Sequence, residues 1–486
     1  MSDSGHPAPS APPARPASPA RPSRPAAPTA PVPPAPAAAT PPTATAATAE
    51  PDRSAVEAAL AGLPRVVDLL AARAEEHDRD ATFPYQGIEA VHEAGLLTLT
   101  VSQRYGGPGG TLADTVRVLA QLGRGDASVA VVTAFTLLQH AEQARRASWP
   151  AAGYRRLLTE SRRGPALVNT LRAEPGGRPD EPLGTVARRD DEGWLLTGRK
   201  TYCTGAEALA WMAVTARTDE PEPRVGTFLV RGESEGLEID PTWDQLGLRA
   251  SASHDVVLDA VRVPLELGLG LRTPGREDAQ EAELARAWHD LALAAVAVGV
   301  ARAAEAWLVR FLNQRTPANL TEPLGTLPRY RAGLGEIDAQ LIGAEELLYG
   351  LAPRVDRGEA DAVARTGPAH LLATRAATAA VQQAVALTGN PGLSRRHPLE
   401  RYLRDVLSSR VHLAPEEAVL DAAGRGGGGA GGGGRGARGG GRAAPPPAGG
   451  GAPPAPRPPG GRGVGGGGQR VPTAARTARR ASAASS

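Results

Sequence analysis

The chain has one lysine, Lys200, and every other residue in its total of 54 lysines and arginines is an arginine. Lys200 lies in the segment Gly193–Gly205, which reads Gly-Trp-Leu-Leu-Thr-Gly-Arg-Lys-Thr-Tyr-Cys-Thr-Gly. A lysine ammonium is a compact charge on a flexible stem, and the planar guanidinium of arginine does not replace it at every contact. We therefore expect Lys200 to hold the end of a strand or to pair with a nearby carboxylate.

The same segment contains Cys203, the only cysteine of the chain. A single cysteine can form neither an intramolecular disulfide nor a thiolate cluster for a metal, so we expect no metal site of that kind. The pattern predicts two short strands joined at Thr197-Gly198 and a turn at Tyr202–Gly205. A purely structural interpretation is a β-hairpin with a core tyrosine and a small buried thiol.

Composition separates the two ends from the middle of the chain. Residues 1–52 are rich in Pro, Ala, Ser and Thr, and residues 425–486 are rich in Gly, Ala, Pro and Arg. Neither segment can bury enough apolar surface to offset its chain entropy, so both are predicted to be disordered. The roughly 370 residues between them are enough for several packed subdomains.

Charge is distributed unevenly, because the tail after Asp421 contains arginines and no acidic residue. The formal net charge of +2 therefore conceals an acidic middle region, which argues against nucleic acid as its main partner. A Gly/Arg tail could bind RNA, but this one has no aromatic side chain for base stacking. Proline interrupts the N-terminus, and the longest apolar run, Leu291–Ala301, is too short to span a bilayer. We expect a soluble cytoplasmic protein without a membrane partner.

The hydrophobic period changes twice along the chain, from helical to strand-like and back. Five helices are predicted in a domain of residues 53–165, and the first has Ser54 and Glu57 at capping-box spacing. They cover residues 54–79, 85–94, 112–123, 128–147 and 151–162.

The middle domain, residues 166–275, is predicted to be a small and mainly antiparallel β domain. A C-terminal helical bundle follows over residues 276–424, so the fold class is α+β. The strands are expected at 185–188, 193–197, 210–217, 227–231 and 255–258, and the helices at 291–304, 327–351, 361–387 and 397–407.

Four segments, in this order, resemble the acyl-CoA dehydrogenase superfamily over roughly residues 53–424. They are Phe83–Leu97 with Arg104–Gly109, then Gly193–Gly205, then Leu246–Pro264, and finally Arg401–Asp405. The resemblance implies a flavoprotein with FAD, or alternatively FMN, between the β domain and the C-terminal bundle. It further implies a homo-oligomer, expected to be a homotetramer, that acts on a small-molecule substrate such as an acyl-CoA. An electron acceptor or a flavin reductase would be its redox partner.

The resemblance also implies which residues bind the cofactor. By the match, Tyr202, Cys203 and Thr204 lie against the flavin ring. Arg315 occupies the place of an arginine that holds the FAD pyrophosphate, although an arginine beside proline can equally be a surface residue. Gly389-Asn390 matches a turn that receives the adenine side of a neighbouring subunit's FAD, and this turn is also compatible with a helix C-cap.

The loop at Glu174-Pro175 departs from the family pattern. The family continues with Gly-Ser-Asp, whereas this chain continues with Gly-Gly-Arg-Pro. The hydroxyl and the carboxylate are missing, so Gly176 and Gly177 are expected to approach flavin and substrate by backbone alone. The purely structural alternative is a Gly/Pro turn.

The largest departure concerns the catalytic base. Typical members place a glutamate eight residues after the aspartate of Arg-Asp, and counting from Asp405 reaches Leu413. Leucine cannot be a general base. Other members place the glutamate on the buried helix, near Asp290 here. Asp290 is therefore the candidate base, against the simpler view of an acid on a helix surface.

A second branch of the superfamily lacks the glutamate and resembles the dibenzothiophene-desulfurising monooxygenases, which use reduced flavin and O₂. That branch carries a histidine after Arg-Asp, where His412 stands, and His140 could be a second active-site histidine. An imidazole near the flavin could stabilise and protonate an oxygen adduct. The alternative for His140 is a partly buried helix histidine.

Three functions therefore remain open. The first is α,β-oxidation of an acyl thioester with hydride transfer to FAD, and the second is a reduced-flavin monooxygenase. The third is a catalytically impaired relative, because the helix expected after Arg-Asp stops at Gly424 in a glycine-rich tail.

Overall fold

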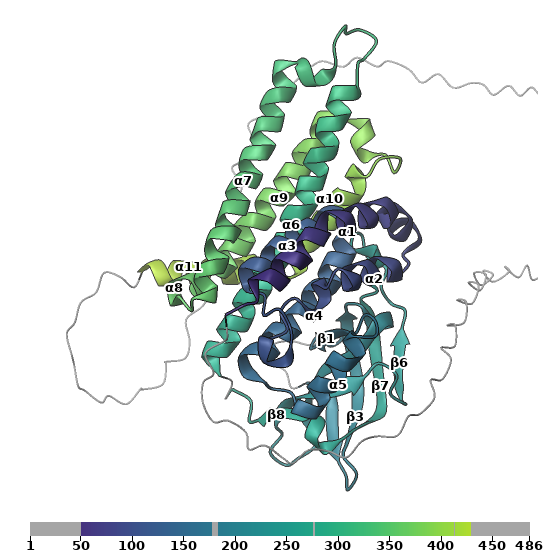
Figure 1. Ribbon diagram of the computed structural model, residues 1–486, viewed down its shortest axis with the longest axis vertical. Helices are drawn as coiled ribbons and strands as arrows, with labels where there is room; N and C mark the ends of the chain where they lie inside the picture. The colour runs from purple at the N-terminus through teal and green to yellow at the C-terminus, as the bar shows by residue number, and fades with distance from the viewer. Residues whose placement is uncertain (1–49, 177–182, 276–277, 413, 429–486) are drawn as a thin grey trace, which may run out of the picture. The chain divides into compact units, whose positions relative to one another are not determined.

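The computed structural model describes residues 50–176, 183–275, 278–412 and 414–428. Its N-terminal part is helical, as predicted (Figure 1). The helices are α1 (Arg53–Asp80), α2 (Tyr85–Glu93), α3 (Leu112–Gly125), α4 (Ala127–Arg146) and α5 (Ala151–Ser161). α3 starts with a complete capping box, in which Thr111 and Asp114 satisfy each other's backbone N–H groups.

The middle part forms one eight-stranded sheet, in the order β6-β7-β3-β2-β4-β5-β8, with β1 also paired to β4. The strands are β1 (Leu167–Leu171), β2 (Val186–Arg189), β3 (Trp194–Cys203), β4 (Leu209–Thr218), β5 (Val225–Arg231), β6 (Leu237–Asp240), β7 (His254–Val263) and β8 (Gly268–Arg272). β1 and β2 run parallel to β4, and the other pairings are antiparallel.

The C-terminal part is a helical bundle in which α6, α7 and α9 run alongside one another (Figure 1). Its helices are α6 (Ala279–Gln314), α7 (Pro328–Asp356), α8 (Ala360–Ala364), α9 (Thr366–Thr388), α10 (Leu399–Ser408) and α11 (Glu416–Gly428). The order of helices, sheet and helices confirms the α+β class. Short 3-10 helices connect the elements: η1 (Leu96–Thr98), η2 (Gln103–Tyr105), η3 (Ala206–Ala208), η4 (Arg249–Ser251), η5 (Leu265–Leu267), η6 (Leu324–Thr326), η7 (Asn390–Leu393) and η8 (Ser409–His412).

α6 is the central helix of the bundle and is apolar nearly all round, because it packs against α3, α4, α7 and α9. Its contact with α3 is close enough to need glycine. A Cβ on Gly299 would lie 2.1 Å from the carbonyl oxygen of Ala120, and one on Gly123 would lie 2.5 Å from that of Val296. Among the described helices, α6 alone has the length and composition of a membrane span, but 72% of its most apolar window is buried in the protein. A core helix gives the same pattern.

Several expected local features are wrong. The cap of α1 is Asp52, which accepts the N–H of Ala55, so the Ser54 and Glu57 spacing does not form a capping box. The segment Gly193–Gly205 is not a hairpin, because β3 passes through Gly198 as one continuous strand with irregular pairing to β7. The residue at Gly198 has φ +156° and an added Cβ would meet Thr185 at 2.6 Å, which explains the glycine.

Other differences lie at element boundaries. β1, β6 and β8 were not expected, since they are short and lack a clear alternation. The helix predicted over 361–387 is split into α8 and α9. α11 continues past Gly424 to Gly428. Residues 1–49 and 429–486, where the tails are predicted to be disordered, lie outside the described residues.

Candidate functional site

The 241–253 loop, between β6 and β7, fastens the sheet to the C-terminal bundle. The backbone N–H of Leu248 donates to Oδ1 of Asp405 on α10 at 2.8 Å. Arg404, one residue earlier, donates to the carbonyl oxygen of Leu246 and to both carboxylate oxygens of Asp78 on α1. These bonds make the Arg401–Asp405 segment the point where α1, the loop and α10 meet.

A cavity of about 270 Å³ lies beside this junction, and we call it the histidine cavity. Its wall is mostly apolar and comes from one face of α4 and one face of α6. The loop contributes Leu248, and the chain after α10 contributes Ser409 and His412. Among the described residues that line it, Asp405 is the single carboxylate. The apolar side chains of its wall include Val131, Leu293, Val296 and Val300.

His412 belongs to a cluster of three histidines. Its ring lies 6.3 Å from the ring of Phe135 on α4, and His289 on α6 lies 6.2 Å from the same phenyl ring. The third member, His370 on α9, is fully buried. The carboxylate of Asp290 lies between two of them, since its Oδ1 is 3.9 Å from Nδ1 of both His289 and His370.

Burial keeps the imidazoles of His370 and His412 neutral. It lowers the pKa of His412 to about 3, with a further contribution from His289 and His370. Burial likewise lowers the pKa of His370 to about 4, although Asp290 opposes the shift. Nε2 of His412 has no hydrogen-bond partner among the described residues. A neutral imidazole with a free ring nitrogen can accept a proton there.

Asp290, the predicted base, is buried on α6, with 5% of its side chain exposed. It is therefore not an acid on a helix surface. Its Oδ2 is 3.4 Å from Nη1 of Arg286 and 3.4 Å from Oγ1 of Thr366. The carboxylate thus faces α9 and the neighbouring imidazoles. The role of Asp290 as a base stays a prediction.

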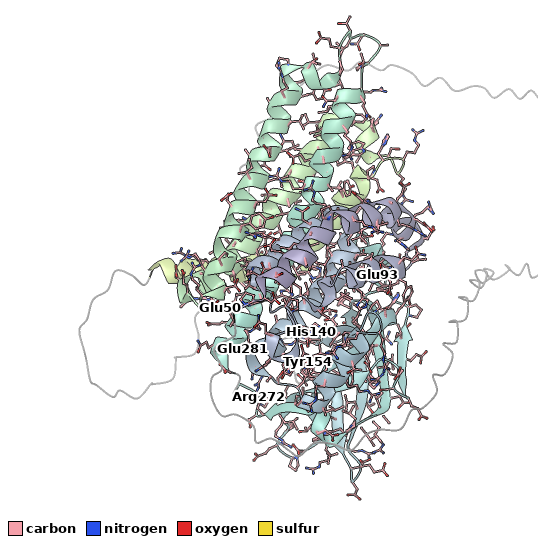
Figure 2. The ribbon with its side chains drawn as sticks, viewed as in Figure 1. Glu50, Glu93, His140, Tyr154, Arg272 and Glu281 are labelled. Atoms are coloured by element: carbon pink, nitrogen blue, oxygen red, sulfur yellow. The ribbon has the colours of Figure 1, made fainter. Side chains whose placement is uncertain are left out.

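His140, the other predicted histidine, lies in a different environment. Its Nδ1 is 2.9 Å from the hydroxyl oxygen of Tyr154 on α5 (Figure 2), and both side chains are buried. The Tyr154 ring also contacts Trp149 and Tyr105. Burial lowers the pKa of His140 to about 4. No described contact joins His140 to His412, so the structure does not bring the two histidines together.

At the end of β3, Tyr202 has a strained backbone and an exposed side chain. Tyr202 has φ +56°, is 66% exposed and meets the Trp243 ring edge-on at 6.5 Å. Thr204 is buried, and its hydroxyl oxygen lies 2.9 Å from that of Ser253. Because Trp243 and Ser253 belong to the 241–253 loop, the loop links this segment to the histidine cavity.

Cys203 points into the core between them. It is 1% exposed, and burial raises the pKa of its thiol to about 12. The thiol is therefore a small buried group and not a nucleophile at neutral pH.

Lys200 pairs with a carboxylate, as expected. Its Nζ lies 2.6 Å from Oε1 of Glu174, and the lysine side chain is completely buried. The same carboxylate accepts the N–H groups of Gly184 at 2.6 Å and Thr185 at 3.0 Å. Burial alone would raise the pKa of Glu174, but these donors lower it to about 2. Gly176 ends the described part of this loop, and Gly177 lies outside the described residues.

Family comparisons agree with this arrangement of domains and site. Models of the N-terminal, middle and C-terminal domains of acyl-CoA dehydrogenase match residues 66–149, 172–261 and 291–417. The chain belongs to the acyl-CoA dehydrogenase family. It is 31% identical over 369 residues to the putative acyl-CoA dehydrogenase YdbM of Bacillus subtilis (strain 168), covering 73% of this chain and 93% of that one.

Solved structures similar to this chain include a butyryl-CoA dehydrogenase and a protein bound to FMN and a nucleotide-linked sugar. The structure of KijD3 with FMN and dTDP-3-amino-2,3,6-trideoxy-4-keto-3-methyl-D-glucose is 26% identical, with a TM-score of 0.67, and covers 79% of this chain and 97% of that one. Butyryl-CoA dehydrogenase of Megasphaera elsdenii is 23% identical, with a TM-score of 0.68, and covers 77% and 97%. The second likeness shows the fold alone.

The family resemblance predicts a flavin where Tyr202–Thr204 meets the 241–253 loop, and the chemistry of the residues there is compatible with one. A flavin ring needs an apolar surface for its face and hydrogen-bonding groups for its edge. The exposed ring of Tyr202 offers the surface, whereas the hydroxyl groups of Thr204 and Ser253 are buried and hydrogen-bonded to each other.

The residues expected to contact the rest of the cofactor, Arg315, Gly389 and Asn390, lie at the ends of helices in the C-terminal bundle. Arg315 caps α6 and is exposed. Gly389, at φ +65°, ends α9, and Asn390 begins η7. The role of Arg315 toward the FAD pyrophosphate, and that of Gly389-Asn390 toward the FAD of a neighbouring subunit, stay predictions.

Sequence reasoning missed His289 and His370. His370 stands in an apolar helical run, where a core histidine is the ordinary interpretation, and nothing in the spacing connects it with Asp290. His289 is adjacent to Asp290, which the sequence predicted as the catalytic base. Only the packing of α6 against α9 and η8 reveals the cluster.

Proposed function

We propose that the protein is a flavin-dependent monooxygenase that uses reduced flavin and molecular oxygen. The observation that supports this most directly is His412, a neutral imidazole with a free Nε2 at the wall of an apolar cavity. The position at which the family's catalytic glutamate is expected is Leu413. Asp405, the single carboxylate among the described residues that line the cavity, accepts a hydrogen bond from the backbone N–H of Leu248.

Reduced flavin, when bound, would supply the electrons that activate oxygen. Nε2 of His412 would accept or return a proton at the cavity wall, where the low dielectric strengthens each electrostatic contact. The side chains of Val131, Leu293 and Val296 would exclude bulk water from the reaction. Phe135, in contact with His289 and His412, would fix the ring of each histidine.

The second candidate is α,β-oxidation of an acyl thioester, and the observation in its favour is the buried carboxylate of Asp290. In this function Asp290 would take the α-proton as hydride passes to the cofactor. The curated relatives named acyl-CoA dehydrogenases also favour it. Against it stands the position of Asp290, whose contacts are with α9 and the imidazoles.

The remaining assignments follow from the family and stay proposals. The cofactor is FAD or FMN, the redox partner is a flavin reductase or an electron acceptor, and the protein works as a homo-oligomer in the cytoplasm. For substrate, the KijD3 complex suggests a nucleotide-linked amino sugar as one class to test beside acyl-CoA.

The first experiment identifies the flavin released from the purified protein by its mass. The oxidised holoprotein is then mixed without oxygen with a panel of acyl-CoA thioesters. A monooxygenase leaves the flavin absorbance unchanged, whereas bleaching by a thioester would establish the dehydrogenase. Failure to retain either flavin would favour the impaired relative.

A further inference from the structure

A second cavity adjoins the histidine cavity, and we call it the acidic cavity. It has about 300 Å³ of empty space, which is partly open to solvent, and its charged lining residues are Asp78, Asp126, Asp405 and Arg401. The two cavities share the side chains of Ala127, Val300 and Asp405. Asp405 is the one ionisable residue among those three. Asp405 therefore lines both the acidic cavity and the histidine cavity, and His412 lines the second of these.

We propose that Asp405 relays protons between the acidic cavity and the histidine cavity. The inference rests on the proposed function, because reduction of oxygen by the anionic form of a reduced flavin consumes a proton in each turnover. Burial keeps His412 neutral, so this imidazole does not store the proton and needs a donor nearby from which to receive it during turnover. Asp78, with a side chain 14% exposed, lies between the acidic cavity and solvent.

The hydrogen bonds of Asp405 leave it able to exchange a proton. Its Oδ1 accepts the N–H of Leu248 at 2.8 Å. The other carboxylate oxygen has no hydrogen bond among the described residues, so a proton can reside there. The Oδ2–H bond breaks and the proton passes to a water or an imidazole in the histidine cavity, which leaves the carboxylate. Water in the acidic cavity then protonates that carboxylate again. The net result is one proton moved inward, with no change in Asp405.

The charges that face Asp405 come from three elements. Arg401 on α10 favours the carboxylate form, whereas Asp78 on α1 and Asp126 at the start of α4 oppose it. Burial is the largest influence, and together they raise the pKa of Asp405 to about 7. The side chain is thus part protonated and part ionised at neutral pH, as a relay requires.

The simpler role of Asp405 is to hold Leu248 in place. Asp405→Asn separates the two roles, because the amide oxygen still accepts the N–H of Leu248 but the side chain no longer titrates. Asp356→Asn is the matched control. It removes a carboxylate that accepts the N–H groups of Leu112 and Ala113 and lines neither cavity.

The test uses full-length, flavin-loaded protein and two readouts. Infrared difference spectra over about pH 5 to 9 follow the carboxyl stretch of a protonated acid, a range that brackets a strongly raised carboxyl pKa. We expect a band that titrates near neutrality, shifts rapidly in D₂O and disappears in Asp405→Asn but not in Asp356→Asn. Arg401→Gln should raise the midpoint of that band, because it removes the opposing positive charge.

The second readout is the rate at which the reduced protein is oxidised by O₂, followed against pH. In Asp405→Asn the rate should no longer change with pH near neutrality, and it should fall by about 10²-fold, the lower end of the range for general acid–base groups. A titrating band with an unchanged rate profile would overturn the relay. Absence of the band would overturn it too, whichever reaction the protein catalyses. Bleaching by acyl-CoA with a normal Asp405 band would instead reject the proposed function.

Discussion

The ammonium of Lys200 and the carboxylate of Glu174 form a buried ion pair, with Nζ 2.6 Å from Oε1 and no exposed surface on the lysine. The pair connects β3, which leads into the segment predicted to face the flavin, with the chain that follows β1. Glu174 also accepts the backbone N–H groups of Gly184 and Thr185. The only lysine of the chain therefore joins three segments beside the predicted cofactor region.

Removing one partner of this pair should destabilise the protein strongly. Lys200→Met leaves Glu174, 10% exposed, without its cation, and we expect a loss of about 3–5 kcal/mol in the free energy of unfolding. Urea denaturation of the apoprotein measures it. The double variant Lys200→Met, Glu174→Gln should recover part of the loss, since it removes the uncompensated charge.

Lys200→Arg keeps the charge but crowds a fully buried site. We expect the purified variant to lose much of its bound flavin while the midpoint of its urea denaturation stays close to that of the wild type. Equal flavin content in variant and wild type would show that Lys200 has no part in the cofactor site.

Buried neutral histidines should make the protein sensitive to acid. The pKa of His370 is about 4 in the folded protein, against 6.5 as its ordinary value. Unfolding then takes up a proton between these values, so stability is complete above pH 6.5 and falls as the pH drops toward 4. One such group contributes up to about 1.4 kcal/mol per pH unit.

His370→Leu should flatten this acid limb in urea denaturation repeated across the range. His92→Leu, at a half-buried position on α2, controls for loss of an imidazole. An acid limb of unchanged slope in His370→Leu would mean that the histidine is already charged in the folded protein.

The two candidate functions predict opposite effects at Asp290 and His412. For a monooxygenase, His412→Asn should slow the oxygen reaction by about 10²-fold or more, while Asp290→Asn should have a smaller effect. For a dehydrogenase, Asp290→Asn should abolish bleaching by acyl-CoA and His412→Asn should be mild. Stopped-flow traces of both variants, each with confirmed flavin content, distinguish these patterns.

The sequence was sufficient for the order of domains, because long periodic helices and turn-bounded strands carry that information locally. It also predicted a carboxylate partner for Lys200. It did not reveal that β3 is continuous, since Thr197-Gly198 reads as a turn, and the glycine is explained only by its approach to Thr185.

The candidate site was only partly accessible to sequence reasoning. His412 could be selected from its position after Arg-Asp, but His370 joins it through the packing of α9 against α6. Tertiary packing also separates His140 from this cluster, because its hydrogen-bond partner is Tyr154 on α5. The shared position of Asp405 between two cavities is a property of packing that no linear pattern contains.

The central claim is that this protein directs reduced flavin toward oxygen with the help of His412. The most direct measurement mixes the photoreduced, flavin-loaded protein with oxygenated buffer in a stopped-flow diode-array instrument, with free reduced flavin as the reference. The account predicts an absorbing species that is neither reduced nor oxidised flavin and that decays faster in His412→Asn. Direct formation of oxidised flavin, as in the reference, together with anaerobic bleaching of the oxidised protein by an acyl-CoA, would contradict it.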